Sequence, residues 1–311
     1  MFQCAYRDPY LLYTDNLLET PDDSSSLIHI NEAHEIIYCV SGSLTANIEG
    51  VRYTVMPGDL LLIRDAEMHI TAPETLPTQF HHIKFSPYYF NFFDTENRIC
   101  RPFSEHPFGI GNLVPGSRLN RPLIENCFAN IRGTRDAYMR RVAVFGTLMM
   151  ILSDVNQCYD YDRSHHVDTR SAVLQEIITY INSHLDEDLN PDKIASRLYI
   201  SRSQLDRIFK QNIGFTLWKY ITFKRLIRAR HLLHAGIANN EVARLCGFGD
   251  YSTFYKVYTK VWGRPPRAAQ PNETTDPLLK QFYKFDDTAS IIDATDELEG
   301  LFQRMKRLQL E

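Results

Sequence analysis

Cysteine is scarce in this chain, and its cysteines form no recognisable pattern. Six are scattered over 311 residues, and no two are spaced as Cys-x-x-Cys. In a chain of this size, such scattering predicts reduced thiols and argues against a disulfide framework and against a zinc site. We therefore expect the fold to be held by packing and hydrogen bonding rather than by covalent or metal cross-links.

Long apolar runs are missing as well. The most apolar helical stretch, residues 142–152, is much shorter than the roughly 20 residues that a transmembrane helix needs. The first residues of the chain do not show a basic start followed by an apolar core, as a secretion signal would. These absences predict a cytoplasmic protein.

The motifs of several common enzyme classes are also absent. The sequence contains no Gly-x-Ser-x-Gly, no His-Glu-x-x-His and no glycine-rich phosphate loop. We therefore expect that the protein is not an enzyme and that it holds no cofactor.

Charge is distributed unevenly along the chain. The formal net charge is −4, yet residues 189–270 carry 15 Lys or Arg against 4 Asp or Glu. The rest of the chain is correspondingly acidic. A basic block within an acidic chain is expected of a nucleic-acid-binding domain, although a solvated basic surface would give the same count.

The region before residue 86 is typical of short β-strands. Its segments combine β-branched or aromatic residues with polar alternation, and Gly or Pro turns separate them. Many short strands without intervening helices predict a small antiparallel barrel or sandwich. The predicted strands are residues 26–31, 35–40, 43–49, 51–56, 59–64 and 78–85.

Helical periodicity follows in residues 122–131 and 137–154. In the second segment an apolar stripe, which includes Met139, Val142 and Met149, repeats at spacings of three and four. This helix could pack on the barrel or on a second copy of itself, and the sequence alone favours neither.

A helical unit then occurs twice between residues 193 and 263. Ala195 and Ala243 lie 48 residues apart, and Gly214 and Gly263 lie 49 apart, because one residue is gained in the turn. In each copy, a polar residue can cap the second helix. A long helix at residues 215–233 joins the copies. A helix that is buried on one side and polar on the other fits a reader of the DNA major groove.

The polar face of each second helix is the predicted DNA-binding surface. The first copy is the more basic, so we expect it to contribute more charge-driven affinity than the second, whose face carries tyrosines. The predicted DNA-binding residues are Arg202, Ser203, Gln204, Asp206, Arg207 and Lys210 in the first copy, and Asp250, Tyr251, Ser252, Tyr255 and Lys256 in the second.

Two motifs carry a family resemblance. Ala243-RLCGFGDYSTFYKVYTKVWGRP-Pro266 and Ile200-SRSQLDRIFKQNIG-Phe215 resemble the two helix-turn-helix units of the AraC/XylS family. Glu35-IIYCVSG-Ser43 and Tyr53-TVMPGDLLLI-Arg64 resemble, less specifically, the cupin-type barrel of such regulators. The resemblance implies a bacterial, nucleoid-associated regulator of transcription. Its implied partners are double-stranded promoter or operator DNA, a small-molecule effector, RNA polymerase and a second copy of the chain.

The barrel offers a candidate effector site. Metal-binding cupins carry two histidines one residue apart, then a glutamate and later a third histidine. Here Asn31 stands at one histidine position, and an amide is a poor ligand for transition metals. We therefore predict a pocket for a polar molecule, with sugars as a candidate class, and no metal. The alternative is a metal-dependent cupin enzyme fused to a DNA-binding domain. The predicted effector-binding residues are His29, Asn31, Glu35, His69 and His82.

The predicted fold class is an α+β multidomain chain. An antiparallel cupin-like barrel with following helices, residues 1–158, is expected to bind the effector and to dimerise. A linker at residues 159–170 leads to an all-α domain of two helix-turn-helix units joined by a long helix, residues 171–270. Residues 271–311 form an extension with a predicted amphipathic helix.

Overall fold

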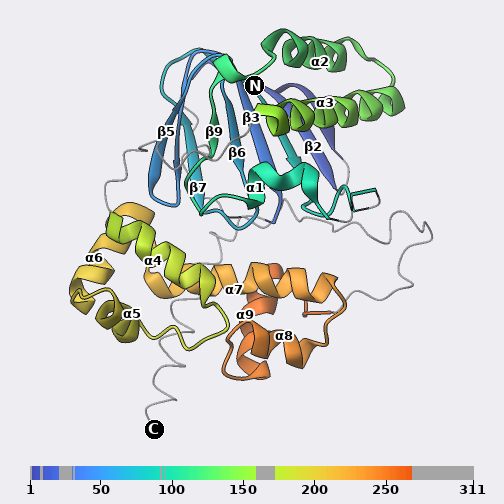
Figure 1. Ribbon diagram of the computed structural model, residues 1–311. Coiled ribbons are helices and arrows are strands. Elements are labelled where there is room, and N and C mark those ends of the chain that lie inside the picture. The colour runs from blue at the N-terminus through green and yellow to red at the C-terminus, as the bar shows by residue number, and fades with distance from the viewer. Residues whose placement is uncertain are drawn as a thin grey trace. The chain divides into compact units, whose positions relative to one another are not determined.

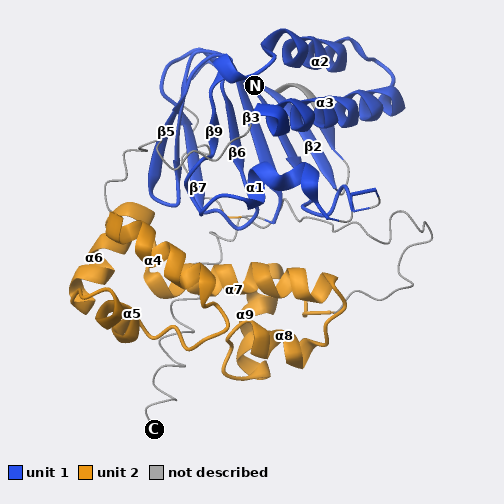
Figure 2. Ribbon diagram, in the orientation of Figure 1, with its two compact units in different colours: residues 1–27, 32–170, 276–285 blue, residues 28–31, 171–275, 286–311 orange. Residues whose placement is uncertain are grey.

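The structure, a computed structural model, describes residues 2–7, 10–20, 30, 32–91, 93–94, 96–158 and 172–267. The chain divides into two compact units (Figure 2). Among the described residues, the first unit contains residues 2–20 and 32–158, and the second contains residues 172–267.

Two antiparallel sheets form the framework of the first unit (Figure 1). One sheet has six strands in the order β1-β2-β8-β3-β6-β9, and the other has three in the order β5-β4-β7. The strands are β1 (Phe2–Arg7), β2 (Leu11–Leu18), β3 (His34–Ser41), β4 (Leu44–Ile48), β5 (Val51–Val55), β6 (Leu60–Ile63), β7 (His69–Pro73), β8 (Thr78–Phe85) and β9 (Leu113–Val114).

Alternation of side chains creates a core between the two sheets. On β5, Val51, Tyr53 and Val55 are buried, whereas the residues between them are exposed. They pack in one apolar cluster with residues of the six-stranded sheet such as Ile37 and Leu61. Successive residues of a strand point to opposite faces, so Ile36 and Leu62 join a second cluster on the other side of the same sheet.

Helices cover that second face of the six-stranded sheet. Phe128 and Leu148 are buried in the same cluster as the outward-facing strand residues. Replacing a buried phenylalanine such as Phe128 by alanine would cost about 3–5 kcal/mol of unfolding free energy. The helical elements of this unit are η2 (Arg98–Cys100), α1 (Arg101–Ser104), η3 (Gly116–Arg118), α2 (Arg121–Gly133) and α3 (Ala137–Cys158).

The second unit is entirely helical over its described residues. Its longest helix, α7, is buried along most of its length, and Thr216 caps it by accepting a hydrogen bond from the Lys219 amide at 3.3 Å. Asn182 of α4 donates to the Tyr220 hydroxyl of α7 at 3.1 Å. The helices are α4 (Ala172–Ser183), α5 (Pro191–Arg197), α6 (Arg202–Ile213), α7 (Leu217–His234), α8 (Asn239–Leu245) and α9 (Tyr251–Trp262).

The predicted fold class is confirmed, with omissions. The strands β1, β2, β7 and β9 were not predicted from the sequence. The predicted strand at residues 26–31 lies outside the described residues apart from Ile30, and so do the predicted linker and the tail beyond residue 267. Across the part of the chain that the structure describes, no helix combines the length and the apolar character needed to cross a bilayer.

Candidate functional site

The helical unit contains two helix-turn-helix repeats, and the second helix of the first repeat, α6, is capped at both ends. The Ser201 hydroxyl accepts a hydrogen bond from the Gln204 amide at 3.2 Å, and the Gln204 side chain accepts one from the Ser201 amide at 2.8 Å. This reciprocal pair is a capping box, which satisfies two amides that would otherwise lack partners. Gly214 ends the helix at a φ of 83°. The prediction that a polar residue caps this helix is therefore confirmed, and the residue is Ser201.

The second helix of the second helix-turn-helix repeat, α9, has an aspartate cap. Asp250 accepts from the Thr253 amide and from the Thr253 hydroxyl, each at 2.8 Å. Hydrogen bonds from the Thr253 amide and hydroxyl, together with the Ser252 amide and the charge of Lys256, lower the pKa of the Asp250 carboxyl. Gly263 ends α9 at a φ of 64°, so the two copies of the repeat begin and end alike.

The basic residues on the outward face of α6 differ in whether they form ion pairs within the chain. Arg202 forms ion pairs with Asp206 at 2.9 Å and with Asp192 at 3.6 Å. By contrast, the side chains of Arg207 and Lys210 are exposed and form no hydrogen bond or ion pair with another described residue. Their cationic groups are therefore available to a ligand in a way that the Arg202 guanidinium is not.

The outward face of α9 is aromatic. Tyr251 and Tyr255 are exposed, with ring centroids 6.0 Å apart, and Ser252 and Lys256 are exposed beside them. Tyr251 also lies within 3.5 Å of the Asn239 amide nitrogen at the start of α8. Such a face offers hydroxyls and apolar ring edges to a partner, whereas the face of α6 offers charge.

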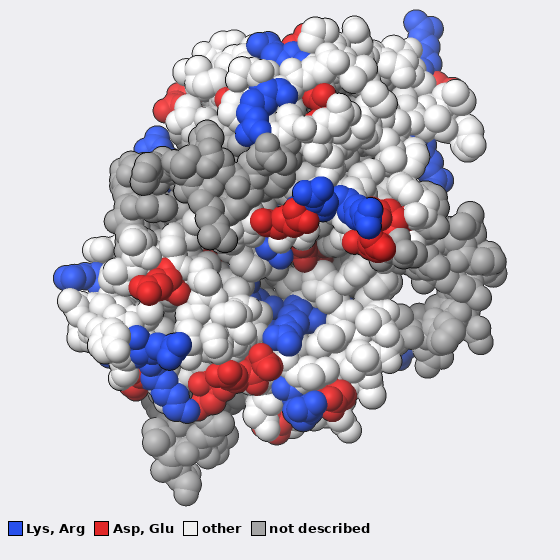
Figure 3. Space-filling model, viewed as in Figure 1, with Lys and Arg blue, Asp and Glu red and all other residues white. Residues whose placement is uncertain are grey.

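Several of the basic residues that make residues 189–270 positive are buried in the long helix α7. Lys224, Arg225 and Arg230 count toward the local excess of positive charge, yet their exposed fractions are only 1%, 5% and 4%. Arg230 lies over the Trp262 ring at 4.5 Å from its centroid. On the face seen in Figure 3, positive and negative side chains are interspersed. The cations that can meet a ligand are thus fewer than the sequence indicated.

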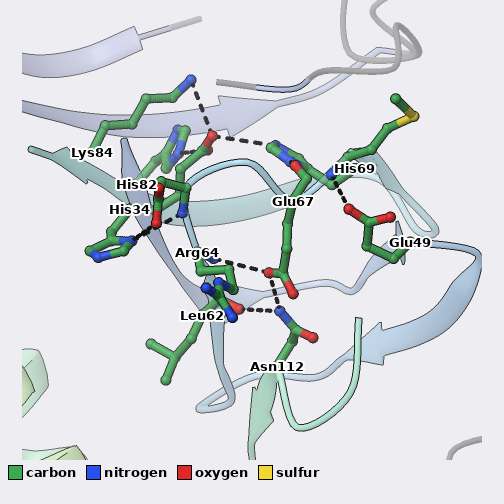
Figure 4. A network of polar contacts seen from close by, with 12 residues as sticks. His34, Glu49, Leu62, Arg64, Glu67, His69, His82, Lys84 and Asn112 are labelled. Atoms are coloured by element: carbon green, nitrogen blue, oxygen red, sulfur yellow. Dashed lines mark hydrogen bonds and ion pairs between the residues drawn. The ribbon is translucent and has the colours of Figure 1, made fainter. Parts of the chain in front are cut away.

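A buried polar cluster lies between the two sheets of the first unit (Figure 4). Its centre is Glu35 of β3, which is 1% exposed. His82 and Lys84 of the neighbouring strand β8 approach its carboxylate at 2.6 and 3.5 Å, and His69 of β7 approaches from the other sheet at 3.3 Å. The carboxylate therefore links the two sheets of the barrel.

The neighbouring groups favour the charged forms of Glu35 and His69. Burial alone would raise the pKa of Glu35, but the charges of Lys84 and His69 and hydrogen bonds from both histidines hold it well below its usual value. Burial acts on His69 in the opposite sense, yet Glu35 and the Glu67 carbonyl raise the pKa of the imidazole. The two ring nitrogens of His69 face a carboxylate and a carbonyl, both acceptors, and this arrangement suits the doubly protonated imidazole.

A second buried carboxylate, that of Glu67, stands two residues before His69. Glu67 is 1% exposed and accepts hydrogen bonds from the Arg64 amide at 3.0 Å, the Gly109 amide at 2.8 Å and the Asn112 side chain at 2.7 Å (Figure 4). These bonds fix the residues that lead into β7. The orientation of His69 is therefore held by its surroundings as well as by Glu35.

The structure brings together three of the five predicted effector-site residues, namely Glu35, His69 and His82. His29 and Asn31 lie outside the described residues. The sequence analysis missed Lys84, although a signal was present. Lys84 stands two residues after His82 on one strand, so both side chains point to the same face.

The cluster does not fit a transition metal of the kind found in metal cupins. Both oxygens of Glu35 already face nitrogen donors, and one of these is the ammonium group of Lys84. A cation would have to displace these donors and lie beside a positive charge. No group of three or more His, Cys, Asp or Glu within the described ranges is arranged to hold a metal ion.

Comparison with known proteins identifies both units. Residues 19–124 match the family described as "AraC-like ligand binding domain", and residues 194–271 match "Helix-turn-helix domain". The HTH-type transcriptional activator RhaS of Citrobacter koseri is 24% identical over 245 residues, which are 77% of this chain and 85% of RhaS.

A second relative matches over a shorter stretch. The HTH-type transcriptional regulator GbdR of Pseudomonas aeruginosa is 34% identical over 123 residues, which are 38% of this chain. The match spans about a third of the length of GbdR, 34%.

Solved structures of related proteins were also found. ToxT from Vibrio cholerae O395 is 13% identical, with 83% of this chain and 96% of ToxT covered and a TM-score of 0.33. A regulator with an AraC-type DNA-binding domain from Chromobacterium violaceum is 33% identical, with 30% of this chain and 85% of that chain covered and a TM-score of 0.29. On the two family matches and the similarity to RhaS, this chain belongs to the AraC/XylS family of helix-turn-helix transcription regulators.

Proposed function

We propose that the chain binds double-stranded DNA sequence-specifically, with α6 and α9 in successive turns of the major groove. The observation that carries this proposal is the structural repeat. Two helices of 12 residues each are capped by their own flanking side chains, and each presents an exposed polar face. In helix-turn-helix proteins, the N-terminal residues of the second helix contact base edges.

The residues of the two faces take different roles in this proposal. Arg207 reads guanine through two hydrogen bonds to the base edge, while Lys210 contacts phosphate. Ser203 lies one helical turn before Arg207 and approaches a neighbouring base. Gln204 and Asp250 act mainly as caps, and Arg202 and Asp206 act as a pair that stiffens α6. In the second unit, Tyr251, Ser252, Tyr255 and Lys256 form the contact surface.

Comparison of Arg207→Ala with Lys210→Ala tests the base-reading role. Both side chains are exposed on α6, so neither truncation should unfold the domain. Arg207→Ala is expected to lower affinity for a duplex selected from a randomised library by about 1–3 kcal/mol, and to change affinity for scrambled DNA much less. Lys210→Ala should weaken both duplexes alike and reduce the salt dependence. An equal loss on both duplexes for Arg207→Ala would show that Arg207 does not read a base.

For the effector, we propose a small polar molecule, with a sugar as the first candidate, bound between the sheets beside Glu35, His69, His82 and Lys84. A hydroxyl group can donate to a carboxylate and accept from an imidazole or ammonium group, so a polyol matches this mixture of groups. On β3, Ile37 stands two residues after Glu35 and belongs to the apolar core between the sheets, and small-molecule sites usually combine such apolar surroundings with a few polar groups.

We further propose that the chain acts as a homodimer through α3, with RNA polymerase as a further partner of the DNA-bound protein in the cytoplasm. The support lies on α3, where Tyr138, Met139, Val142 and Met150 are 71%, 52%, 45% and 41% exposed. Several exposed apolar side chains on one helix are typical of a protein interface. Effector binding would then alter how the two DNA-binding units of the dimer are presented.

A further inference from the structure

Arg225, in the middle of α7, lies where the two helix-turn-helix units meet. Its guanidinium group donates to the Leu185 carbonyl at 3.0 Å through Nε and to the Glu187 carbonyl at 2.6 Å through Nη2. Both carbonyls belong to the loop between α4 and α5, which leads into the first helix-turn-helix repeat. Arg225 therefore connects the α4–α5 loop, which precedes the first repeat, to α7, the helix that joins the two repeats.

The same guanidinium group lies against the α8–α9 turn of the second repeat. Gly247 has a φ of +71°, and a Cβ atom placed on it would lie 2.6 Å from Nη2 of Arg225 and would also overlap the Leu185 carbonyl oxygen. A methyl group could not be accommodated there without moving the guanidinium or the loop. Three chain segments thus meet at one point: the α4–α5 loop, α7 and the α8–α9 turn.

The internal repeat shows that this close approach is particular to the second unit. Tyr199 stands 48 residues before Gly247, at the same place in the first turn. It also has a positive φ, 55°, yet its side chain is 97% exposed. The turn itself therefore tolerates a large side chain. Glycine is needed at 247 because the turn is pressed against Arg225 and Leu185.

The chemistry of the junction indicates a positional role for Arg225. Burial lowers the pKa of its guanidinium, so placing the charge there has a cost that an apolar side chain of similar volume would avoid. What the guanidinium adds is direction, since its planar fork holds two carbonyls at fixed angles. A helix-turn-helix protein that reads two half-sites needs such fixed angles between its units.

We infer that Arg225 is a positioning residue that fixes the separation and relative orientation of α6 and α9, and so sets the number of base pairs between the two half-sites. This inference rests on the proposed function, in which one chain inserts both helices into DNA. Arg225 itself touches no DNA in this scheme, because it acts through the α4–α5 loop and Gly247.

The test measures spacing preference with the full-length chain. A duplex selected from a randomised library is compared with two copies in which one base pair is inserted or removed between the half-sites. For the wild type, we expect the altered spacing to lower affinity by about 10- to 100-fold, the equivalent of losing one or two base contacts.

Arg225→Lys keeps the charge but loses the fork. We expect it to weaken binding at the selected spacing and to shrink the difference among the three duplexes to about threefold or less, because the two units can then adjust separately. Arg228→Lys is the matched control. Its guanidinium reaches the same loop through Asp186 at 3.5 Å but is 36% exposed, so the spacing preference should stay that of the wild type.

Two results would overturn the inference, and a third would refute the proposed function instead. An Arg225→Lys chain that binds more weakly but keeps the full spacing preference would overturn the inference. Should circular dichroism show that this variant is unfolded, Gly247→Ala displaces the guanidinium from the other side, and it is expected to flatten the preference too. A wild type that binds all three duplexes equally would overturn the inference without any variant, whereas failure to bind any duplex would refute the proposed function.

Discussion

Glu35 is a carboxylate removed from water and surrounded by nitrogen donors. Its pKa is lowered in the folded protein relative to a usual value of 4.5. The unfolded chain therefore takes up a proton before the folded chain does, so ionised Glu35 stabilises the fold above about pH 4.5 and this contribution is lost as the pH falls. Near neutral pH the Glu35 carboxylate is therefore ionised, which is the state that a polar effector would meet.

Replacement of His82 by glutamine tests the effector site at the scale of one residue. The side chain of His82 is 19% exposed, so it is the cluster member most open to a ligand beside Lys84. A bound sugar at about 100 times its Kd should stabilise the wild type by roughly 2.7 kcal/mol, and His82→Gln should lose most of that gain. A thermal-shift screen with sugars measures the difference.

Thr54→Ala serves as the control for this screen, because Thr54 is exposed on the outer side of β5. It should keep the full ligand-induced shift. A sugar that stabilises wild type, His82→Gln and Thr54→Ala equally would show that the ligand binds elsewhere.

At the scale of elements, the sequence predicted some features well and others poorly. The capping residues of α6 and α9 were predictable because capping depends on a few neighbouring residues. The burial of Lys224 and Arg225 was not, because it depends on contacts far along the chain, such as the one between Arg225 and Leu185. A basic residue in a helix is usually exposed, and only packing on several sides reverses that expectation.

Gly146 on α3 offers a test of the dimer. Glycine within a helix costs about 1 kcal/mol relative to alanine. Apart from the adjoining residues and the backbone of α3 itself, no described atom would lie within 4 Å of a Cβ atom at Gly146. In a monomer, Gly146→Ala should therefore stabilise α3. If a second chain packs across this position, Gly146→Leu should obstruct it and raise the dimer dissociation constant by tenfold or more, about 1.4 kcal/mol.

Analytical ultracentrifugation measures this constant. Ala129→Leu, a similar enlargement at an exposed position on α2, is the control and should leave dimerisation unchanged. A Gly146→Leu chain that associates as tightly as the wild type would place the interface elsewhere.

At the scale of the whole molecule, the order of the parts was predictable, and parts of the sheet were not. The strands β3 to β6 and β8 were found because each is a short run rich in apolar residues between turn residues, and β4 and β5 also alternate in burial along the strand. The strand β2 was missed, although it pairs with β8 over its whole length. Its register is set by a partner more than 60 residues away, and such long-range pairing leaves little trace in the local sequence.

The central claim is that the helical unit carries the DNA-binding activity and that the barrel regulates it. The direct measurement compares the full-length chain with the fragment of residues 171–311 by fluorescence anisotropy on the selected duplex, across a range of salt concentrations. The account predicts that the fragment binds this duplex with a strong salt dependence and that the effector alters binding only of the full-length chain. A folded fragment that binds no DNA even at low salt would contradict it.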